Sequence, residues 1–196
     1  MKGLILAAGR GTRLRPLTHT RPKPVIRVAG RPIIHYAVEN LLAAGVEEIG
    51  VVVSPETEKD IREALSGYKV RYLLQEEPQG LAHAVAVARG FLGEGPFVLY
   101  LGDNLFQRGI GRFLEAFREG VSAVLALVRV KDPRQFGVAV LEGDRIVRLL
   151  EKPKEPPSDL AVAGVYVLGP EIWETVEGLK PSARGEYEIT DAIQGL

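Results

Sequence analysis

Apolar residues in the first two thirds of the chain fall into short continuous runs. The runs cover residues 3–8, 48–53, 70–74, 97–101 and 122–130. Runs of this length are typical of strands buried on both faces of a parallel sheet. Helical spacing predicts helices between the runs, at residues 33–44, 58–65 (with Thr57 as cap), 81–91 and 110–119. Strands that alternate with helices indicate parallel strands joined by right-handed crossovers.

The pattern changes after residue 131, where a β-rich segment begins. Its apolar segments predict a hairpin at residues 137–141 and 145–150, a further strand at 160–168 and a short helix at 171–176. We therefore expect an α/β fold: a Rossmann-like, mainly parallel sheet with helices on both faces and a β-rich insert. We expect one domain over residues 1–196, with a core at 1–130 and the insert in 131–196.

Composition narrows the functional classes. The 196 residues are 46% apolar and 26% charged with no net charge, which is close to the average of globular proteins. This balance excludes a disordered chain and gives no bulk attraction to nucleic acid or membrane. Cysteine is absent, which excludes a disulfide framework, a zinc ribbon and thiol catalysis. Because no window approaches the roughly 18 apolar residues of a membrane span, we expect a cytoplasmic enzyme or binding protein.

Basic side chains are concentrated at the start of the chain. Residues 1–38 hold eight basic side chains and no acidic one. Such a segment is suited to an anion such as phosphate, although a solvated basic face or a nucleic-acid-binding module would carry the same charge. The basic residues lie in a loop rich in Gly and Pro rather than along a helix, and no aromatic residues interleave them, which disfavours nucleic acid.

The glycine-rich loop after the first strand carries the most specific chemistry. Its sequence, LAAGRGTRLRPLTHTRPKP, fails the dinucleotide fingerprint because Leu14 stands where the third glycine is needed, and it lacks the Walker A motif. It nevertheless brings backbone donors, a hydroxyl, a guanidinium and an ammonium to one strand end, through Gly9, Gly11, Thr12, Arg13 and Lys23. Open α/β sheets bind ligands at the carboxyl ends of their strands, so a triphosphate fits these groups.

Five further motifs follow the loop in order along the chain. They are Gln75…Gly80-Leu81-Ala82, Gly102-Asp103-Asn104, Phe136-Gly137-Val138, Glu151-Lys152-Pro153 and Gly185-Glu186-Tyr187-Glu188-Ile189-Thr190-Asp191. Together with the loop they resemble the sugar nucleotidylyltransferases over nearly the whole chain, and within that family most closely the thymidylyltransferases that use glucose 1-phosphate. The resemblance implies a β-rich insert that binds sugar.

The same resemblance implies a reaction, a cofactor and partners. An NTP (dTTP or UTP) and a sugar 1-phosphate, for which glucose 1-phosphate is expected, would give an NDP-sugar and pyrophosphate. Mg²⁺ would be the cofactor, and a homo-oligomer is one possible state. A mannose-1-phosphate guanylyltransferase and a nucleotide-binding regulatory protein are the alternatives.

The resemblance also implies roles for individual residues. Triphosphate contacts would come from Ala7, Gly9, Gly11, Thr12 and Arg13, and base contacts from Gln75 and Gly80. Sugar-phosphate contacts would come from Gly137, Glu151, Lys152 and Gly164. The Mg²⁺ ligands would be Asp103 and Asp191. The catalytic residues would be Arg13, Lys23, Asp103 and Lys152.

From the residues alone, several of these positions have a purely structural alternative. Asp103 fits a turn, Asp191 a helix cap and Gln75 an exposed strand end. Glu151 and Lys152 fit an exposed ion-pair edge. The resembling family's core continues beyond the motif that ends at Asp191. We therefore expect the sugar-binding part of this chain to be incomplete, and the chain to bind NTP better than it turns over sugar phosphate.

Overall fold

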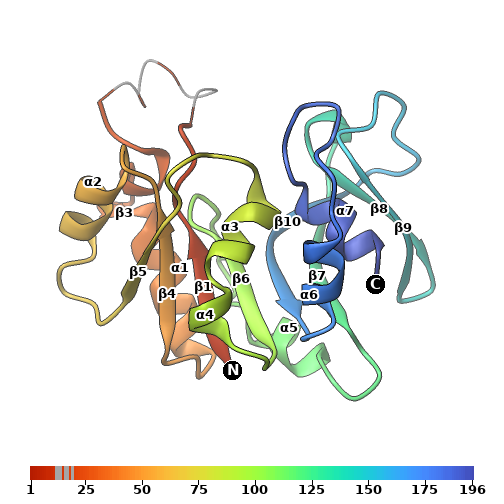
Figure 1. Cartoon of the computed structure of the whole chain (residues 1–196), viewed down its shortest axis with the longest axis horizontal. Helices are drawn as coiled ribbons and strands as arrows, with labels where there is room; N and C mark the ends of the chain where they lie inside the picture. The colour runs from red at the N-terminus through yellow and green to blue at the C-terminus, as the bar shows by residue number, and fades with distance from the viewer. Residues whose placement is uncertain (12–14, 16–17, 19) are drawn as a thin grey trace.

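A single eight-stranded mixed sheet forms the centre of the computed structural model, which describes residues 1–11, 15, 18 and 20–196 (Figure 1). Its strands are β1 (Lys2–Leu6), β4 (Ile49–Val53), β5 (Arg71–Leu74), β6 (Phe97–Leu101), β7 (Ala123–Arg129), β8 (Gly137–Glu142), β9 (Arg145–Glu151) and β10 (Leu160–Leu168). A separate short hairpin is formed by β2 (Arg27–Val28) and β3 (Arg31–Pro32).

The helices lie between and after these strands. They are α1 (Ile33–Ala43), α2 (Glu58–Ala64), α3 (Leu81–Val87), α4 (Arg89–Leu92), α5 (Gly111–Ala116), α6 (Ile172–Glu177) and α7 (Ile189–Gln194). Two 3-10 turns are η2 (Lys23–Val25) and η3 (Pro133–Gln135).

The parallel half of the sheet has the order β5-β4-β1-β6, and these four strands are parallel, as the alternation of apolar runs and helices predicted. Leu4 of β1 lies between Gly50 of β4 and Leu99 of β6. Successive side chains point to opposite faces, so Leu4 and Leu99 enter one apolar core while Ile5 enters another.

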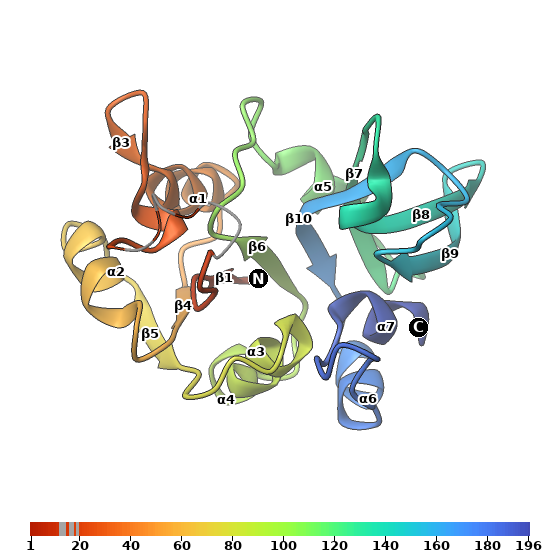
Figure 2. The same ribbon diagram turned by 90° about the horizontal axis from the view of Figure 1, so that it is seen from above.

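Helices cover both faces of this sheet (Figure 2). Side chains of α1, α2 and α5 pack in the core that contains Ile5, and those of α3, α4, α6 and α7 pack in the core that contains Leu4. The expected α/β fold with helices on both faces is therefore confirmed. In the described part of the chain, no helix is long and apolar enough to cross a bilayer.

The fifth apolar run, residues 122–130, does not extend the parallel half as expected. It forms β7, which pairs antiparallel with β10, and β10 lies antiparallel beside β6. An apolar run indicates burial on both faces but not strand direction, because a central antiparallel strand can be buried in the same way. The register of β10 against β7 shifts between Val162 and Tyr166. The division of the chain at residue 130 stays a prediction.

The helices differ from the prediction in three ways: one predicted cap is missing, one predicted helix is divided, and one helix was not predicted. Thr57 makes no capping bond to α2; its Oγ1 instead accepts a hydrogen bond of 3.0 Å from the N–H of Ser54. The predicted helix 81–91 is divided at Ala88, whose N–H bonds to Val85 three residues back, as in a tighter 3-10 turn. The additional helix, α7, carries the Asp191 motif.

We expect Leu99→Ala to lower the free energy of unfolding by about 2–5 kcal/mol, because it leaves a cavity in the centre of the sheet. Leu99 is fully buried on β6, whereas Leu42 on α1 is 45% exposed, so Leu42→Ala is the control and should cost far less. Urea titration followed by circular dichroism measures both. Equal losses would contradict this description of the core.

Candidate functional site

Strands of the parallel half end at one edge of the sheet, and candidate residues follow three of them. Gln75 follows β5, the loop at Gly9 follows β1, and Asp103 follows β6. Adjacent strands lie about 4.8 Å apart, so the ends of β5 and β6 are roughly 15 Å from each other. This is the edge at which open α/β sheets bind ligands.

The antiparallel half brings its candidate residues to the same edge. Because β10 runs opposite to β6, Gly164 lies beside the end of β6. Gly137 of β8 pairs with Glu151 of β9 and approaches Val162 of β10. From one end of the sheet to the other, the edge therefore carries Gln75, Gly9, Asp103, Gly164 and Glu151.

Ala7 and Gly9 mark the place where the chain leaves the sheet. The N–H of Ala7 still donates to the carbonyl of Val52 at 2.8 Å, and its side chain is buried. Gly9 is exposed, and no atom of the described residues lies within 4 Å of the position that a Cβ would take. Among those residues, nothing fills the space beside Gly9.

A solvent-open cavity of about 380 Å³ adjoins this loop and is lined by Arg10, Arg15, Thr18 and Glu56. Thr18 closes the loop, because its Oγ1 donates to the carbonyl of Gly11 at 2.6 Å. Two guanidinium groups on a polar cavity can bind phosphate oxygens. Thr12 and Arg13, both predicted to bind the triphosphate, lie outside the described residues.

Lys23 and Asp103 form an ion pair, with 2.7 Å between Nζ and Oδ2. Lys23 begins η2 between Pro22 and Pro24, and about a third of each charged side chain is exposed. The amide of Asn104 donates to the other oxygen of Asp103 at 2.9 Å. The structure thus brings together the predicted lysine and a predicted metal ligand, and both carboxylate oxygens of Asp103 are engaged.

The residues fit Mg²⁺ only as a site shared with phosphates. The described residues contain no group of three or more His, Cys, Asp or Glu side chains placed to hold a metal ion. Mg²⁺ is commonly held by one or two carboxylates together with substrate phosphates, so Asp103 at the phosphate loop is a suitable ligand.

Asp191 lies in the first turn of α7, where Glu188 is the N-cap, so the reading of Asp191 as a helix cap is wrong. Partial removal from water raises the pKa of the Asp191 carboxyl, and the negative charge of Glu188 raises it further. Its part in a metal site stays a prediction.

Gln75 is buried, with 3% of its surface exposed, so the reading as an exposed strand end is wrong. Its N–H continues the β4–β5 ladder by donating to the carbonyl of Val53 at 2.8 Å. Its side-chain Nε2 lies 2.8 Å from Nδ1 of His83 and 3.4 Å from the carbonyl of Gly80. The amide is therefore held by the start of α3.

Gly80 has φ of 105°, and a Cβ there would lie 2.5 Å from the carbonyl oxygen of Tyr187. Tyr187 accepts the N–H of Ala82 at 3.0 Å and donates its own N–H to the carbonyl of Gln79 at 2.8 Å. The glycine is thus required by this close approach, which ties the last motif to the predicted base site.

Glu151 is held at the far end of the edge by the last motif. The hydroxyl of Thr190 donates to Glu151 Oε2 at 2.7 Å, and a Cβ on Gly137 would lie 3.1 Å from that hydroxyl. Burial raises the pKa of the Glu151 carboxyl, and the charge of Glu188 adds to this effect, while the hydrogen bond from Thr190 opposes it. Glu151 is thus no exposed ion-pair edge.

Lys152 follows Glu151 in the chain, and Gly164 contacts the residue that follows Asp103. Lys152 has φ of 43°, which is unusual for a residue with a side chain, and its N–H donates to the carbonyl of Phe136 at 2.9 Å. A Cβ on Gly164 would lie 2.5 Å from the side chain of Asn104, whose Oδ1 accepts the Gly164 N–H at 3.3 Å. Asn104 therefore links Asp103 to β10.

His83, Asn104 and Thr190 had no predicted role. Asn104 and Thr190 lie inside quoted motifs, and His83 comes directly after one. The motifs were therefore the only available signal, because the contacts of these residues join segments far apart in the chain.

Residues 2–196 match a protein family described as nucleotidyl transferase. A low-salt glycan biosynthesis nucleotidyltransferase of Haloferax volcanii is 45% identical over 203 residues, which cover all of this chain and 57% of the relative. A glucose-1-phosphate thymidylyltransferase of Streptomyces antibioticus is 46% identical over 204 residues, with the same coverage. The chain spans 57% of the length of these curated relatives.

A solved structure gives the same result for the fold. It is a Bacillus anthracis protein assigned as a glucose-1-phosphate thymidylyltransferase and solved with sucrose. It is 37% identical, with a TM-score of 0.89, and the match covers 98% of this chain and 80% of the other.

We expect Glu151→Gln to remove a pH-dependent loss of stability. Because the pKa of Glu151 is raised in the folded state, the native protein binds more protons, and wild-type stability falls as pH rises from the ordinary glutamate pKa through the raised value. The Glu151→Gln variant and the wild type should therefore have the same melting temperature in acid. As the pH rises through that range, the melting temperature of the variant should become higher than that of the wild type. Glu155→Gln, at an exposed position, is the control. A pH-independent difference would contradict this account.

Proposed function

Because this chain belongs to the nucleotidyl transferase family, we propose that the protein transfers a nucleotide from an NTP to a sugar 1-phosphate, giving an NDP-sugar and pyrophosphate. Glucose 1-phosphate and dTTP are the first substrates to test, since the name of the Streptomyces antibioticus relative specifies them. UTP is the second nucleotide, because thymine and uracil present the same hydrogen-bonding edge.

The order of residues along one edge of the sheet supports this proposal. Gln75 lies at the end of β5, and the loop at Gly9 follows β1, two strands away or roughly 10 Å. An NTP with its base at Gln75 would extend its phosphates to that loop. A sugar phosphate near Glu151 and Lys152, on the other side of Asp103, would then meet the α-phosphate.

In the proposed reaction, an oxygen of the sugar phosphate attacks the α-phosphorus in line. A P–O bond forms there as the bond to the β-phosphate oxygen breaks, and pyrophosphate leaves with the electron pair. No covalent bond to the protein is needed. Because such transfer depends mainly on positioning and charge stabilisation, the chain's part is to hold the two phosphates and neutralise the leaving group.

Each charged residue has a part in that task. Lys23 would neutralise the departing pyrophosphate, together with Arg13 from the part of the loop outside the described residues. Lys152 would bind the sugar phosphate. Glu151, fixed by Thr190, would accept hydrogen bonds from sugar hydroxyls.

Mg²⁺, the proposed cofactor, would reduce the repulsion between the two phosphate groups when bound. Asp103 would be one ligand, and Asp191 is proposed as the second. For this, Lys23 has to leave Asp103. Because both side chains are partly exposed, phosphate oxygens can take the place of Asp103 at Lys23 when the ligand binds.

The function is tested by measuring pyrophosphate release over a grid of four NTPs and several sugar 1-phosphates with Mg²⁺. We expect the highest rate with dTTP or UTP and glucose 1-phosphate. Calorimetric titration of each nucleotide separates binding from turnover. Binding of both a nucleotide and glucose 1-phosphate without pyrophosphate release would favour the nucleotide-binding regulatory protein.

We expect Lys23→Ala to lower kcat by roughly 10²- to 10³-fold without loss of folding, as for other preorganised charges that stabilise a leaving group. Lys59→Ala, at an exposed position on α2, is the control and should leave the rate unchanged. The pyrophosphate assay gives kcat, and circular dichroism checks folding. A folded Lys23→Ala variant with the wild-type rate would remove Lys23 from the mechanism.

A further inference from the structure

We propose that His83 is a positioning residue that fixes the orientation of the Gln75 side-chain amide, and that this orientation selects thymine or uracil over cytosine. The inference rests on the proposed function, because it assigns a specificity to the same nucleotide site. It concerns a residue that no motif of the sequence analysis included.

The carbonyl of Gly80 shows which atom of the Gln75 amide faces α3, and the shorter contact to His83 holds that atom there. One amide atom lies 3.4 Å from this carbonyl oxygen and 2.8 Å from Nδ1 of His83. A main-chain carbonyl can only accept hydrogen bonds, so the atom that faces it is the NH₂ group. The reversed amide would place two oxygens against each other.

The same constraint decides the tautomer of His83. Since the amide presents N–H donors to α3, Nδ1 of His83 has to accept, and its ring proton is therefore on Nε2. The backbone of His83 is fixed in this position, because Gly80 also accepts the N–H of Ala84 at 3.2 Å at the start of α3. Gln75 thus has one fixed orientation.

This orientation leaves the Gln75 carbonyl oxygen, Oε1, for a ligand. Among the described residues, no donor is bonded to Oε1, and Trp173 Nε1 is the one fully enclosed side-chain polar atom without a partner. Oε1 therefore reaches the surface at the end of β5. An acceptor at this position matches the N3–H of thymine and uracil, whereas N3 of cytosine is itself an acceptor and would repel it.

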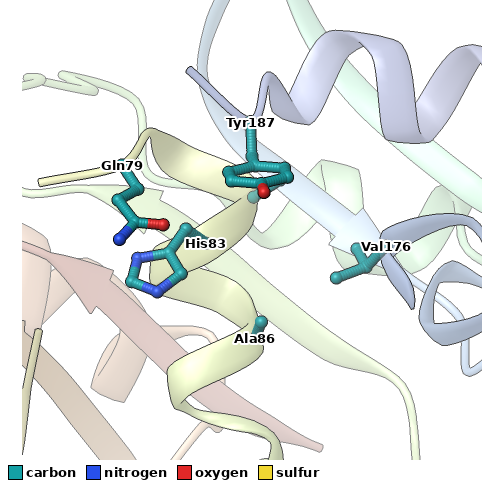
Figure 3. A pocket seen from close by; sticks show the side chains of 6 residues that line it. Gln79, His83, Ala86, Val176 and Tyr187 are labelled. Carbon is teal, nitrogen blue, oxygen red and sulfur yellow. The ribbon is translucent and has the colours of Figure 1, made fainter. Parts of the chain in front are cut away.

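His83 also lines a cavity of about 150 Å³ between α3, α6 and Tyr187 (Figure 3). Figure 3 shows the His83 ring beside the Gln79 side chain, with Val176 across the cavity on α6. The cavity gives a substituted side chain at position 83 room to settle without overpacking. It also supplies a control, Val176→Ala, which enlarges the cavity without touching Gln75.

Two substitutions separate the hydrogen bond from the packing. His83→Leu removes the acceptor, and His83→Gln restores one through its side-chain carbonyl. Calorimetric titration with dTTP, UTP and dCTP, each with Mg²⁺, gives the ratio of the dCTP and dTTP dissociation constants. We expect this ratio to fall roughly tenfold in His83→Leu, the size of effect that one hydrogen bond produces, and to stay near wild type in His83→Gln and Val176→Ala.

The outcomes distinguish the two proposals. A wild-type protein that binds none of the nucleotides overturns the proposed function and this inference with it. A wild-type protein that prefers dTTP, with the same ratio in folded His83→Leu, overturns the role of His83 alone. If His83→Leu does not fold, the ¹⁵N NMR spectrum of wild-type histidine decides: the Nε2–H tautomer at His83 is expected, and the Nδ1–H tautomer overturns the inference.

Discussion

The antiparallel pairing of β10 with β6 holds the two halves of the molecule together. Val165 lies opposite Tyr100, and Leu168 lies opposite Phe97, and all four side chains are fully buried. Because β10 reverses the direction of the parallel strands, its beginning lies where they end. A slip of one residue in this register would turn the side chains of β10 to the opposite face of the sheet and move Gly164 away from Asn104. The pairing therefore assembles one site from segments more than a hundred residues apart.

The ion pair of Lys23 and Asp103 at the end of the parallel strands is partly exposed on both sides, whereas the ion pair of Arg184 and Glu188 has an exposed guanidinium and a buried carboxylate. Lys23 and Asp103 are each about one-third exposed, so a charged ligand can replace either partner at small cost. Glu188 is 5% exposed and accepts hydrogen bonds of 3.0 and 2.7 Å from Arg184. Breaking that pair would leave a buried charge, which is far more costly. The buried Glu188 therefore depends on its arginine, whereas neither Lys23 nor Asp103 is fully buried.

Much of the fold and part of the site could be predicted from the sequence. The apolar runs that became β1, β4, β5 and β6 were placed within two residues of their observed ends, because burial on both faces leaves a strong local signal. The motifs likewise indicated which segments carry chemistry. The burial of Gln75 and the ion pair between Lys23 and Asp103 could not be predicted, because each depends on a partner from another part of the chain.

Local composition and motif order are enough to establish the alternation of strands and helices, the glycine-rich loop after the first strand and the family of the chain. Long-range packing instead accounts for the position of β10 between β6 and β7, the hydrogen bond from Thr190 to Glu151 and the contact between His83 and Gln75. Strand order and side-chain pairing depend on which distant surfaces bury each other. A buried polar atom then bonds to whichever partner that packing brings near, and no local pattern in the chain records the choice.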